Sequence, residues 1–291
     1  MASSNTQGAT ATWTPRIPDS EQFPRHPFLW GTIGVLRYEL IRSLSLTRLI
    51  SWLLIFAFPV ALILLAKWQV GQRPRRISPD ELRVGFSFIA FALIPHVAVM
   101  LNLLMWATPV VNTELEGQTW IYSIVRPQGK LNIILGKYLT AIFWSIFGGL
   151  LSATIAIPLL GLDKSFTLWW TLARLVVLSS VAYGALYIAM GTLFQKRAMV
   201  SAFIYTLTVE GFLSLLPATI NQLTVSFRLR CLLVQWLEVR LPAEMRSRAE
   251  IFDLSGTTHH LAALAVYVIV LLSIALLFAR RSEYSLQPDP S

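Results

Sequence analysis

The chain has 291 residues, of which 55% are hydrophobic and 13% charged, and its formal net charge is +9. This composition excludes an ordinary water-soluble domain and is typical of a membrane protein. The cations are scattered at the ends of apolar runs and in loops, without a basic stripe interleaved with aromatic residues. They therefore indicate contact with anionic lipid headgroups and argue against nucleic acid as a partner. Cys231 is the one cysteine, which excludes an intrachain disulfide and a cysteine metal cluster.

The first part of the chain is polar and rich in Pro, Ser and Thr, and it lacks the apolar core of a signal peptide. We expect residues 1–31 to form a disordered tail. From Thr32 to Arg48, apolar residues recur at helical spacing while polar residues fill the other side. This pattern predicts an interfacial helix along the membrane surface, with a plain solvent-facing helix as the alternative.

Six apolar runs are long enough to cross a hydrocarbon core of roughly 30 Å. Backbone amides in lipid must be satisfied within their own segment, so each run predicts a helix. The fold class is therefore all-α, a polytopic membrane protein with six transmembrane helices and a short tail at 281–291. The predicted spans are Leu49–Ala66, Val84–Val111, Tyr138–Leu162, Leu175–Gln195, Ala198–Pro217 and Leu261–Ala279.

A polar stretch, Asn112–Lys137, separates the second and third spans. Thr113 followed by Glu116 matches a capping box, which predicts the start of a short helix. Pro127 is expected to end that helix, because proline lacks the amide donor and disfavours helical geometry in the residue before it. A second helical run then leads into the third span. The stretch is predicted to be a compact helix across the end of the bundle, and an ordinary surface loop is the alternative.

The second half of the chain adds an amphipathic helix and one buried charge. Apolar residues from Val225 to Leu237 lie at helical spacing, which predicts a helix that is interfacial or dips into the membrane. Glu210 is the one acidic residue within a predicted span. A carboxylate inside the membrane costs about 2.5 kcal/mol or more unless it is paired or hydrated. Glu210 is interpreted either as a structural pair with a nearby cation or as part of a transport path, with candidate partners Arg228, Arg230 and His259.

No catalytic constellation and no metal site is visible in the sequence. A phosphate-binding loop needs glycines and a lysine followed by Ser or Thr. Gly129-Lys130 and Gly136-Lys137 do not meet that pattern. His259 and His260 are adjacent, so on a helix they point in different directions.

Two stretches resemble the permease subunits of ABC-2 type exporters. The first, "ELEGQTWIYSIVRPQGKLNIILGKYL", is similar to that family's run of an acidic residue, Gly-Thr, Arg-Pro and Leu-Gly-Lys-Tyr, although Gln118 stands where threonine usually follows the glycine. The second, "GTLFQKRAMVSAFIYTLTVEGFLSLLP", is similar to the family's Trp-Glu-Gly at the end of span five, with Val209 replacing the tryptophan. The resemblance covers roughly residues 32–280.

The resemblance implies that residues 32–280 form a permease domain in the cell membrane, with both termini cytoplasmic. It implies a coupling helix at Asn112–Tyr122 that contacts a separate ATP-binding subunit, and a second permease subunit in a homodimer or heterodimer. ATP and Mg would bind to the partner, with no cofactor on this chain, which would be a transport subunit and not an enzyme. The expected contact residues are Glu114, Glu116, Gln118, Trp120, Tyr122 and Arg126.

Charge alone leaves the orientation open, because Lys and Arg are equally numerous on the two predicted sides. Three other functions stay open beside an exporter permease. A secondary transporter driven by an ion gradient would show broken helices and polar groups near the midplane. A membrane-embedded enzyme would need clustered catalytic side chains. A non-catalytic membrane anchor would need neither. The transported substrate is not indicated by the sequence.

Overall fold

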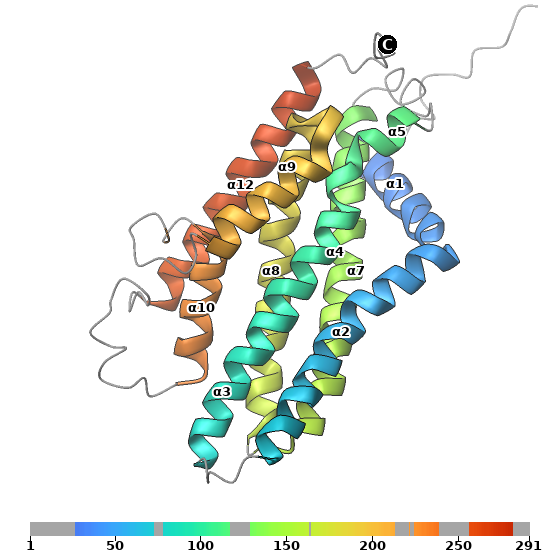
Figure 1. Ribbon diagram of the computed structural model, residues 1–291. Helices are drawn as coiled ribbons and strands as arrows, with labels where there is room; N and C mark the ends of the chain where they lie inside the picture. The colour runs from blue at the N-terminus through green and yellow to red at the C-terminus, as the bar shows by residue number, and fades with distance from the viewer. Residues whose placement is uncertain are drawn as a thin grey trace, which may run out of the picture.

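The computed structural model describes residues 27–72, 78–116, 129–162, 164–212, 221, 224–238 and 256–281. These residues are helical or lie in short connections, without a strand among them, which confirms the all-α prediction (Figure 1). The helices, in chain order, are α1 (Pro27–Ser43), α2 (Leu46–Gly71), α3 (Pro79–Phe91), η2 (Ala92–Ala98), α4 (Val99–Trp106), η3 (Thr108–Val110), α5 (Asn112–Glu116), α7 (Gly129–Leu160), α8 (Ser165–Leu193), η4 (Gln195–Arg197), α9 (Ala198–Tyr205), η5 (Thr206–Phe212), α10 (Val225–Trp236) and α12 (Thr257–Arg281).

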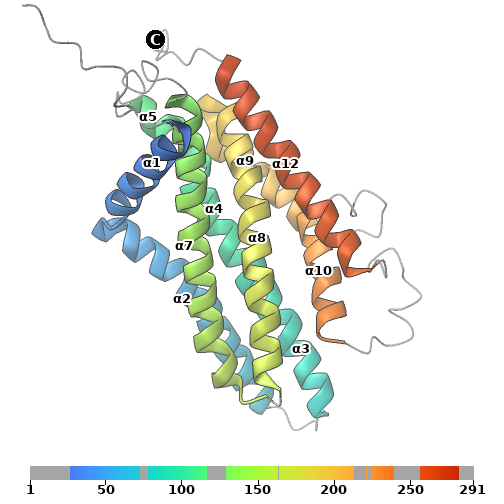
Figure 2. The ribbon, with the colours of Figure 1, turned by 180° about the vertical axis from the view of Figure 1, so that it is seen from behind.

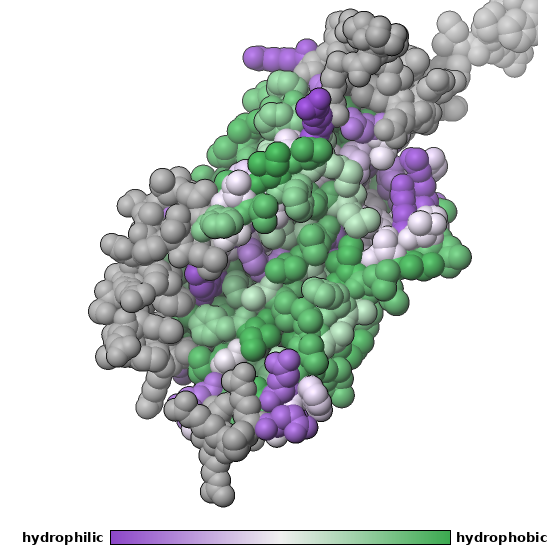
Figure 3. Space-filling model, viewed as in Figure 1, coloured by the Kyte–Doolittle hydropathy of each residue, from purple (hydrophilic) through white to green (hydrophobic). Residues whose placement is uncertain are grey.

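Five helical segments are long and apolar enough to cross a membrane: α2, the continuous run from α3 to η3, α7, α8 and α12. They lie side by side in one bundle, as both ribbon views show (Figures 1 and 2). Apolar residues cover most of the visible surface between the two ends, where hydrophilic residues gather (Figure 3). So many exposed apolar side chains indicate that this surface contacts lipid tails. Five helical segments in the described part of the chain thus have the length and composition of a span, and the count of six crossings stays a prediction.

The segment predicted as the fifth span, Ala198–Pro217, is described only as far as Phe212. Within it, α9 contributes 8 residues of α-helix and η5 contributes 7 residues of π-helix. This run is shorter than the roughly 20 residues that a crossing needs. Its relation to α10 is considered with the candidate site.

The first helix differs from its predicted bounds. Helix α1 begins at Pro27, within the segment predicted to be a disordered tail, and ends at Ser43. Ser45 adopts an extended conformation, and the chain turns there into α2. The prediction of one helix as far as Arg48 was wrong at that end, because the chain must turn from the membrane surface into the bundle. In Figure 1, α1 and α2 meet at a sharp corner.

Helix α1 packs closely against α7, and glycine makes that approach possible. A Cβ atom on Gly136 of α7 would lie 2.5 Å from the Val35 side chain, and one on Gly31 of α1 would lie 2.2 Å from the Asn132 amide. Thr32 donates a hydrogen bond to Asn132 across the same contact, at 3.2 Å. The two helices therefore form a fixed pair at the end of the bundle that carries α5.

The second span contains a π-helical turn, η2, around Pro95. Proline has no amide hydrogen, so it leaves the helix ladder incomplete at this point. The buried Ser179 hydroxyl of α8 donates to the Pro95 carbonyl. A neighbouring helix thus contacts this turn, and the span continues through α4 and η3 to the polar segment that contains α5.

Candidate functional site

Helix α5 lies at the end of the bundle where α7 begins and α12 ends (Figures 1 and 2). It follows η3 after one residue, so the chain leaves the second span and turns directly into α5. The last turn of the span packs against α8, where a Cβ atom on Gly191 would lie 2.1 Å from the carbonyl oxygen of Thr108. The position of α5 is therefore set by close packing below it.

A cluster of buried charges attaches α5 to both α1 and α7. The Lys137 ammonium of α7 lies 2.7 Å from the Glu114 carboxylate of α5 and 3.9 Å from the Glu39 carboxylate of α1. Lys137 also donates to the Val110 carbonyl at 3.1 Å and to the Thr113 hydroxyl at 2.6 Å. The side chains of Lys137 and Glu114 are each 8% exposed. We call Glu39, Arg42, Glu114 and Lys137 the charge cluster.

The charge cluster meets the conditions under which buried ions are tolerated. A buried ammonium is costly unless oxygen atoms take up its three donor hydrogens. Lys137 has three oxygen partners within hydrogen-bonding distance, one on η3 and two on α5, which together fill that capacity. Arg42 adds a partly exposed positive charge 3.9 Å from Glu114. Any movement that separates α5 from α7 would leave buried charges without partners, so the two helices are coupled.

Of the predicted contact residues, only the Glu114 side chain lies within the described part of the chain. The Glu114 carboxylate points into the chain and is engaged by Lys137, so its predicted contact with a partner protein stays a prediction that its burial does not favour. Glu116 ends α5, and its side chain lies outside the described residues. The other predicted contact residues lie outside the described part of the chain, namely Gln118, Trp120, Tyr122 and Arg126.

The predicted capping box was wrong in its first residue. Thr113 lies inside α5, which begins at Asn112, so it does not precede the helix as an N-cap would. Its hydroxyl donates instead to the Pro109 carbonyl at 2.9 Å and accepts from Lys137. The hydroxyl therefore stabilises the charge cluster.

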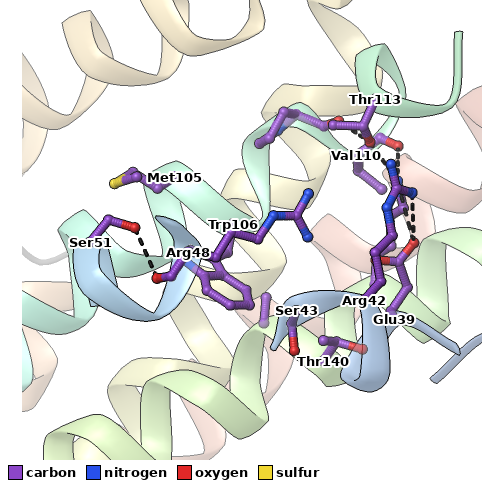
Figure 4. A pocket seen from close by; sticks show the side chains of 13 residues that line it. Glu39, Arg42, Ser43, Arg48, Ser51, Met105, Trp106, Val110, Thr113 and Thr140 are labelled. Carbon is purple, nitrogen blue, oxygen red and sulfur yellow. Dashed lines mark hydrogen bonds and ion pairs between the residues drawn. The ribbon is translucent and has the colours of Figure 1, made fainter. Parts of the chain in front are cut away.

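A pocket of about 130 Å³ lies next to the charge cluster, between α1, the start of α2, the end of the second span and α7. Figure 4 shows Arg42 and Arg48 on opposite sides of it, with Arg48 extended past Trp106. Arg42 is close to Glu39, but the separation of 3.8 Å is too long for a good hydrogen bond. This pocket was not foreseen from the sequence, because its walls come from three separate parts of the chain.

Glu210 occupies a second polar site, deep inside the bundle. Its carboxylate is 1% exposed and accepts the backbone N–H groups of Val225 and Ser226, each at 3.2 Å. Tyr183 of α8 donates to the same carboxylate at 2.9 Å, and its hydroxyl also lies 3.0 Å from Nδ1 of His96. The N–H groups at a helix start carry partial positive charge and have no partner within the helix, so they suit a carboxylate.

The partners predicted for Glu210 included His259, which the structure corrects. His259 is exposed, whereas its neighbour His260 is buried, with Nδ1 3.3 Å from the Arg228 guanidinium. The partners now identified are a tyrosine hydroxyl and the first turn of α10. Sequence spacing gave no sign of Tyr183, because an isolated tyrosine in an apolar run has no distinctive pattern.

Helices α9, η5 and α10 follow α8 one after another. The Thr206 hydroxyl of η5 lies 2.6 Å from the Tyr187 hydroxyl of α8. Tyr183, one turn nearer the start of α8, donates a hydrogen bond to Glu210. Near the end of α10, the Trp236 ring stacks on Arg174 of α8 at 4.3 Å. From Tyr187 to Arg174 these contacts span about 13 residues of α8, or roughly 20 Å at about 1.5 Å per residue. From Leu193, where α8 ends and the chain turns towards α9, to Arg174 there are about 19 residues, or roughly 29 Å.

Comparison of the sequence with protein-family models and with curated proteins finds no match. Among the residues that the structure describes, no group of three or more His, Cys, Asp or Glu side chains is placed to hold a metal ion. A functional assignment must therefore be argued from the charge cluster, the pocket and the Glu210 site.

Proposed function

We propose that this chain is the membrane-spanning permease subunit of an ABC exporter, which forms a transport path and is driven by a separate ATP-binding subunit. The observation that carries the proposal is the attachment of α5 to α1 and α7 by the charge cluster. A segment that receives force from a partner must be joined rigidly to the helices that it moves. The buried pair of Lys137 and Glu114, in which the three ammonium donors all have partners, provides such a joint.

The geometry of the described residues supports this role in a second way. Helix α5 and the C-terminal end of α12 lie at the same end of the bundle (Figure 1). An exporter permease needs its coupling segment on the cytoplasmic side, where ATP is available. In our proposal that end, and with it both termini, faces the cytoplasm.

The proposal also includes a sixth crossing, made by α9, η5 and α10 in succession. From the end of α8 at Leu193 to the contact of Arg174 with Trp236, this path passes along roughly 29 Å of α8, which is close to the roughly 30 Å of a hydrocarbon core. The crossing is interrupted beside Glu210, which accepts the free N–H groups of the second half. Irregular backbone inside a membrane is tolerated where protein groups satisfy it, as the carboxylate does here.

Within this proposal Glu114 is a positioning residue, and the partner contacts fall to the residues that follow it. Glu116, Gln118, Trp120, Tyr122 and Arg126 supply the charged and aromatic surface. ATP-driven closure of two partner subunits would then push on two such segments, one from each permease chain. The permease would alternate between two conformations, and the transported substrate would shift their populations only through the different contacts that it makes in each.

The first experiment tests association. The full chain is purified from membranes of its own host, and co-purifying ATPase activity is measured for the wild type, Trp120→Ala and Trp68→Ala. Trp68 is an exposed tryptophan near the opposite end of α2, so its replacement is a matched control. We expect ATPase activity to be retained by the wild type and Trp68→Ala and lost by Trp120→Ala. Equal retention by both variants would contradict the coupling role.

The second experiment tests orientation. Cys231 is buried and is the one cysteine, so Cys231→Ala provides a cysteine-free background. In that background, Gln118→Cys should react with an impermeant maleimide only after the cells are opened. Gln72→Cys, at the exposed end of α2, should react in intact cells. The reverse pattern would place α5 outside the cell, where no ATP-binding subunit can reach it.

A transporter driven by an ion gradient is the second candidate, and the Glu210 site favours it. Such proteins use interrupted helices whose ends meet charged groups near the midplane. In reconstituted vesicles, uptake that follows an imposed proton gradient without ATP, and that is lost in Glu210→Gln, would favour this candidate. Uptake that needs ATP and survives Glu210→Gln would favour the exporter.

A further inference from the structure

We propose that the pocket beside α1 binds the phosphate group of an anionic phospholipid from the leaflet that α1 contacts. The inference needs only that the chain lies in a membrane, and it does not rest on ATP-driven transport. The pocket measures about 130 Å³, whereas roughly 10–15 Å³ of such space holds one water molecule. It therefore has room for a much larger group.

The donors left free in the pocket define the chemistry of its ligand. The lining hydroxyls already donate to backbone carbonyls: Ser43 to Leu40, Ser51 to Arg48 and Thr140 to Gly136. Arg48 is half-buried, and its guanidinium has no hydrogen-bond or ion-pair partner among the described residues. The ligand must therefore accept hydrogen bonds and carry negative charge.

Two guanidinium groups favour phosphate over other anions. Arg42 touches its carboxylate neighbours only at 3.8 and 3.9 Å, so most of its N–H groups can still donate. Figure 4 shows Arg42 and Arg48 facing the same space from opposite sides. The planar fork of arginine matches phosphate oxygens with paired hydrogen bonds. A phosphate between the two groups would be held from both sides.

The apolar surroundings identify the ligand as a lipid. The corner where α1 meets α2 exposes Ile41, Leu44 and Ile50, each more than half accessible. On the other side of the pocket, Met105 lines the opening, and Leu101 is exposed one helical turn before it. A ligand with a phosphate head and acyl tails satisfies both the guanidinium groups and this apolar rim. A small hydrophilic phosphate ester would leave the rim uncovered.

The test measures binding of palmitoyl-oleoyl phosphatidylglycerol to the delipidated full chain in detergent, by native mass spectrometry. We expect one lipid to bind the wild type more tightly than phosphatidylcholine does. Arg48→Gln should weaken phosphatidylglycerol binding about tenfold, because it removes charge-assisted hydrogen bonds. Arg197→Gln is the control, since Arg197 is exposed at the same end of the bundle, and it should bind as the wild type does.

A second variant separates the site from general effects of charge. Ser51→Phe fills the pocket without changing its charge, and it should also weaken binding. Equal binding by the wild type and Arg48→Gln would overturn the proposal, and so would equal affinity for phosphatidylcholine. The deacylated headgroup, glycerophosphoglycerol, distinguishes the two possible sources of phosphate. If it binds as tightly as the intact lipid, the pocket serves a soluble phosphate ester and the lipid assignment is wrong.

Discussion

Replacing Lys137 by methionine tests whether the charge cluster holds α5 in place. Methionine keeps the length and most of the packing volume of lysine but removes its charge and its three donors. The Glu114 carboxylate would stay buried after losing its 2.7 Å ion pair, while the partly exposed Arg42 remains at 3.9 Å. Removing one partner of a buried ion pair typically costs about 3–5 kcal/mol of folding free energy. We expect a cost near about 3 kcal/mol, because Arg42 supplies some compensation.

Glu114→Gln should cost less than Lys137→Met. The amide oxygen can still accept from Lys137, which also keeps Thr113, Val110 and the more distant Glu39. The expected loss is about 1–1.5 kcal/mol, the usual difference between a hydrogen bond to a charged group and one to a neutral group. In the double variant both charges of the 2.7 Å pair are gone, so its cost should lie clearly below the sum of the two single costs.

The assay is equilibrium unfolding of the purified chain in mixed micelles, followed by tryptophan fluorescence as the fraction of denaturing detergent rises. Lys67→Met is the matched control, because Lys67 is exposed at the opposite end and donates one hydrogen bond, to the Leu159 carbonyl. Its cost should stay below about 1 kcal/mol. If Lys137→Met and Lys67→Met cost the same within about 0.5 kcal/mol, the charge cluster does not fix α5.

Further substitutions probe three other contacts, and each is measured by the thermal unfolding midpoint of the purified chain. Gly191→Ala should destabilise by about 1–3 kcal/mol, because the new methyl group would meet the rigid Thr108 carbonyl at 2.1 Å. Arg174→Gln should cost about 0.5–2 kcal/mol by removing the stack on Trp236, and it should have little effect once Trp236→Leu is present. Glu210→Ala should cost about 3 kcal/mol or more, since three buried donors lose their acceptor, and Glu210→Gln should cost less.

The spans and α10 could be predicted because each depends on a local property of the sequence. A run of apolar residues of sufficient length forms a helix in lipid whatever its neighbours are. The helical spacing from Val225 to Leu237 likewise corresponds to α10. Helix α7 begins at Gly129, before the span predicted from Tyr138, because Lys130 and Lys137 interrupt a scan for uncharged apolar runs.

The orientation of α1 could not be predicted from its amphipathic pattern. In water the apolar side of such a helix faces the protein, but here Ile33, Ile41 and Leu44 are exposed while Glu39 and Ser43 are buried. Lipid is as apolar as a protein core, so packing against α7 favours the side that can form polar contacts. The pairing of Glu39 with Lys137 joins residues far apart in the chain, and no local spacing rule reports such a contact.

The break beside Glu210 was also hidden, because Ala198–Pro217 is one apolar run with a single charge in it. Only the structure brings the first turn of α10 to that charge. The carboxylate accepts hydrogen bonds from N–H groups that have no partner within the helix at its start. The helix start therefore stabilises the charge, and the charge stabilises the helix start. Neither feature would be stable inside a membrane without the other.

From the charge cluster and the Glu210 site we expect one part of the bundle to be stiff and another part to bend. A force on α5 would reach α1 and α7 directly, because separating them exposes unpaired charges. The α9–α10 junction, by contrast, is held beside α8 by hydrogen bonds to one carboxylate, and such bonds can be exchanged at low cost if water enters. If α5 is the segment that a partner pushes, the conformational change should appear at this junction. Accessibility of a cysteine placed beside Glu210 should then change between nucleotide-bound and nucleotide-free states, while a cysteine at the α1–α7 contact should not change.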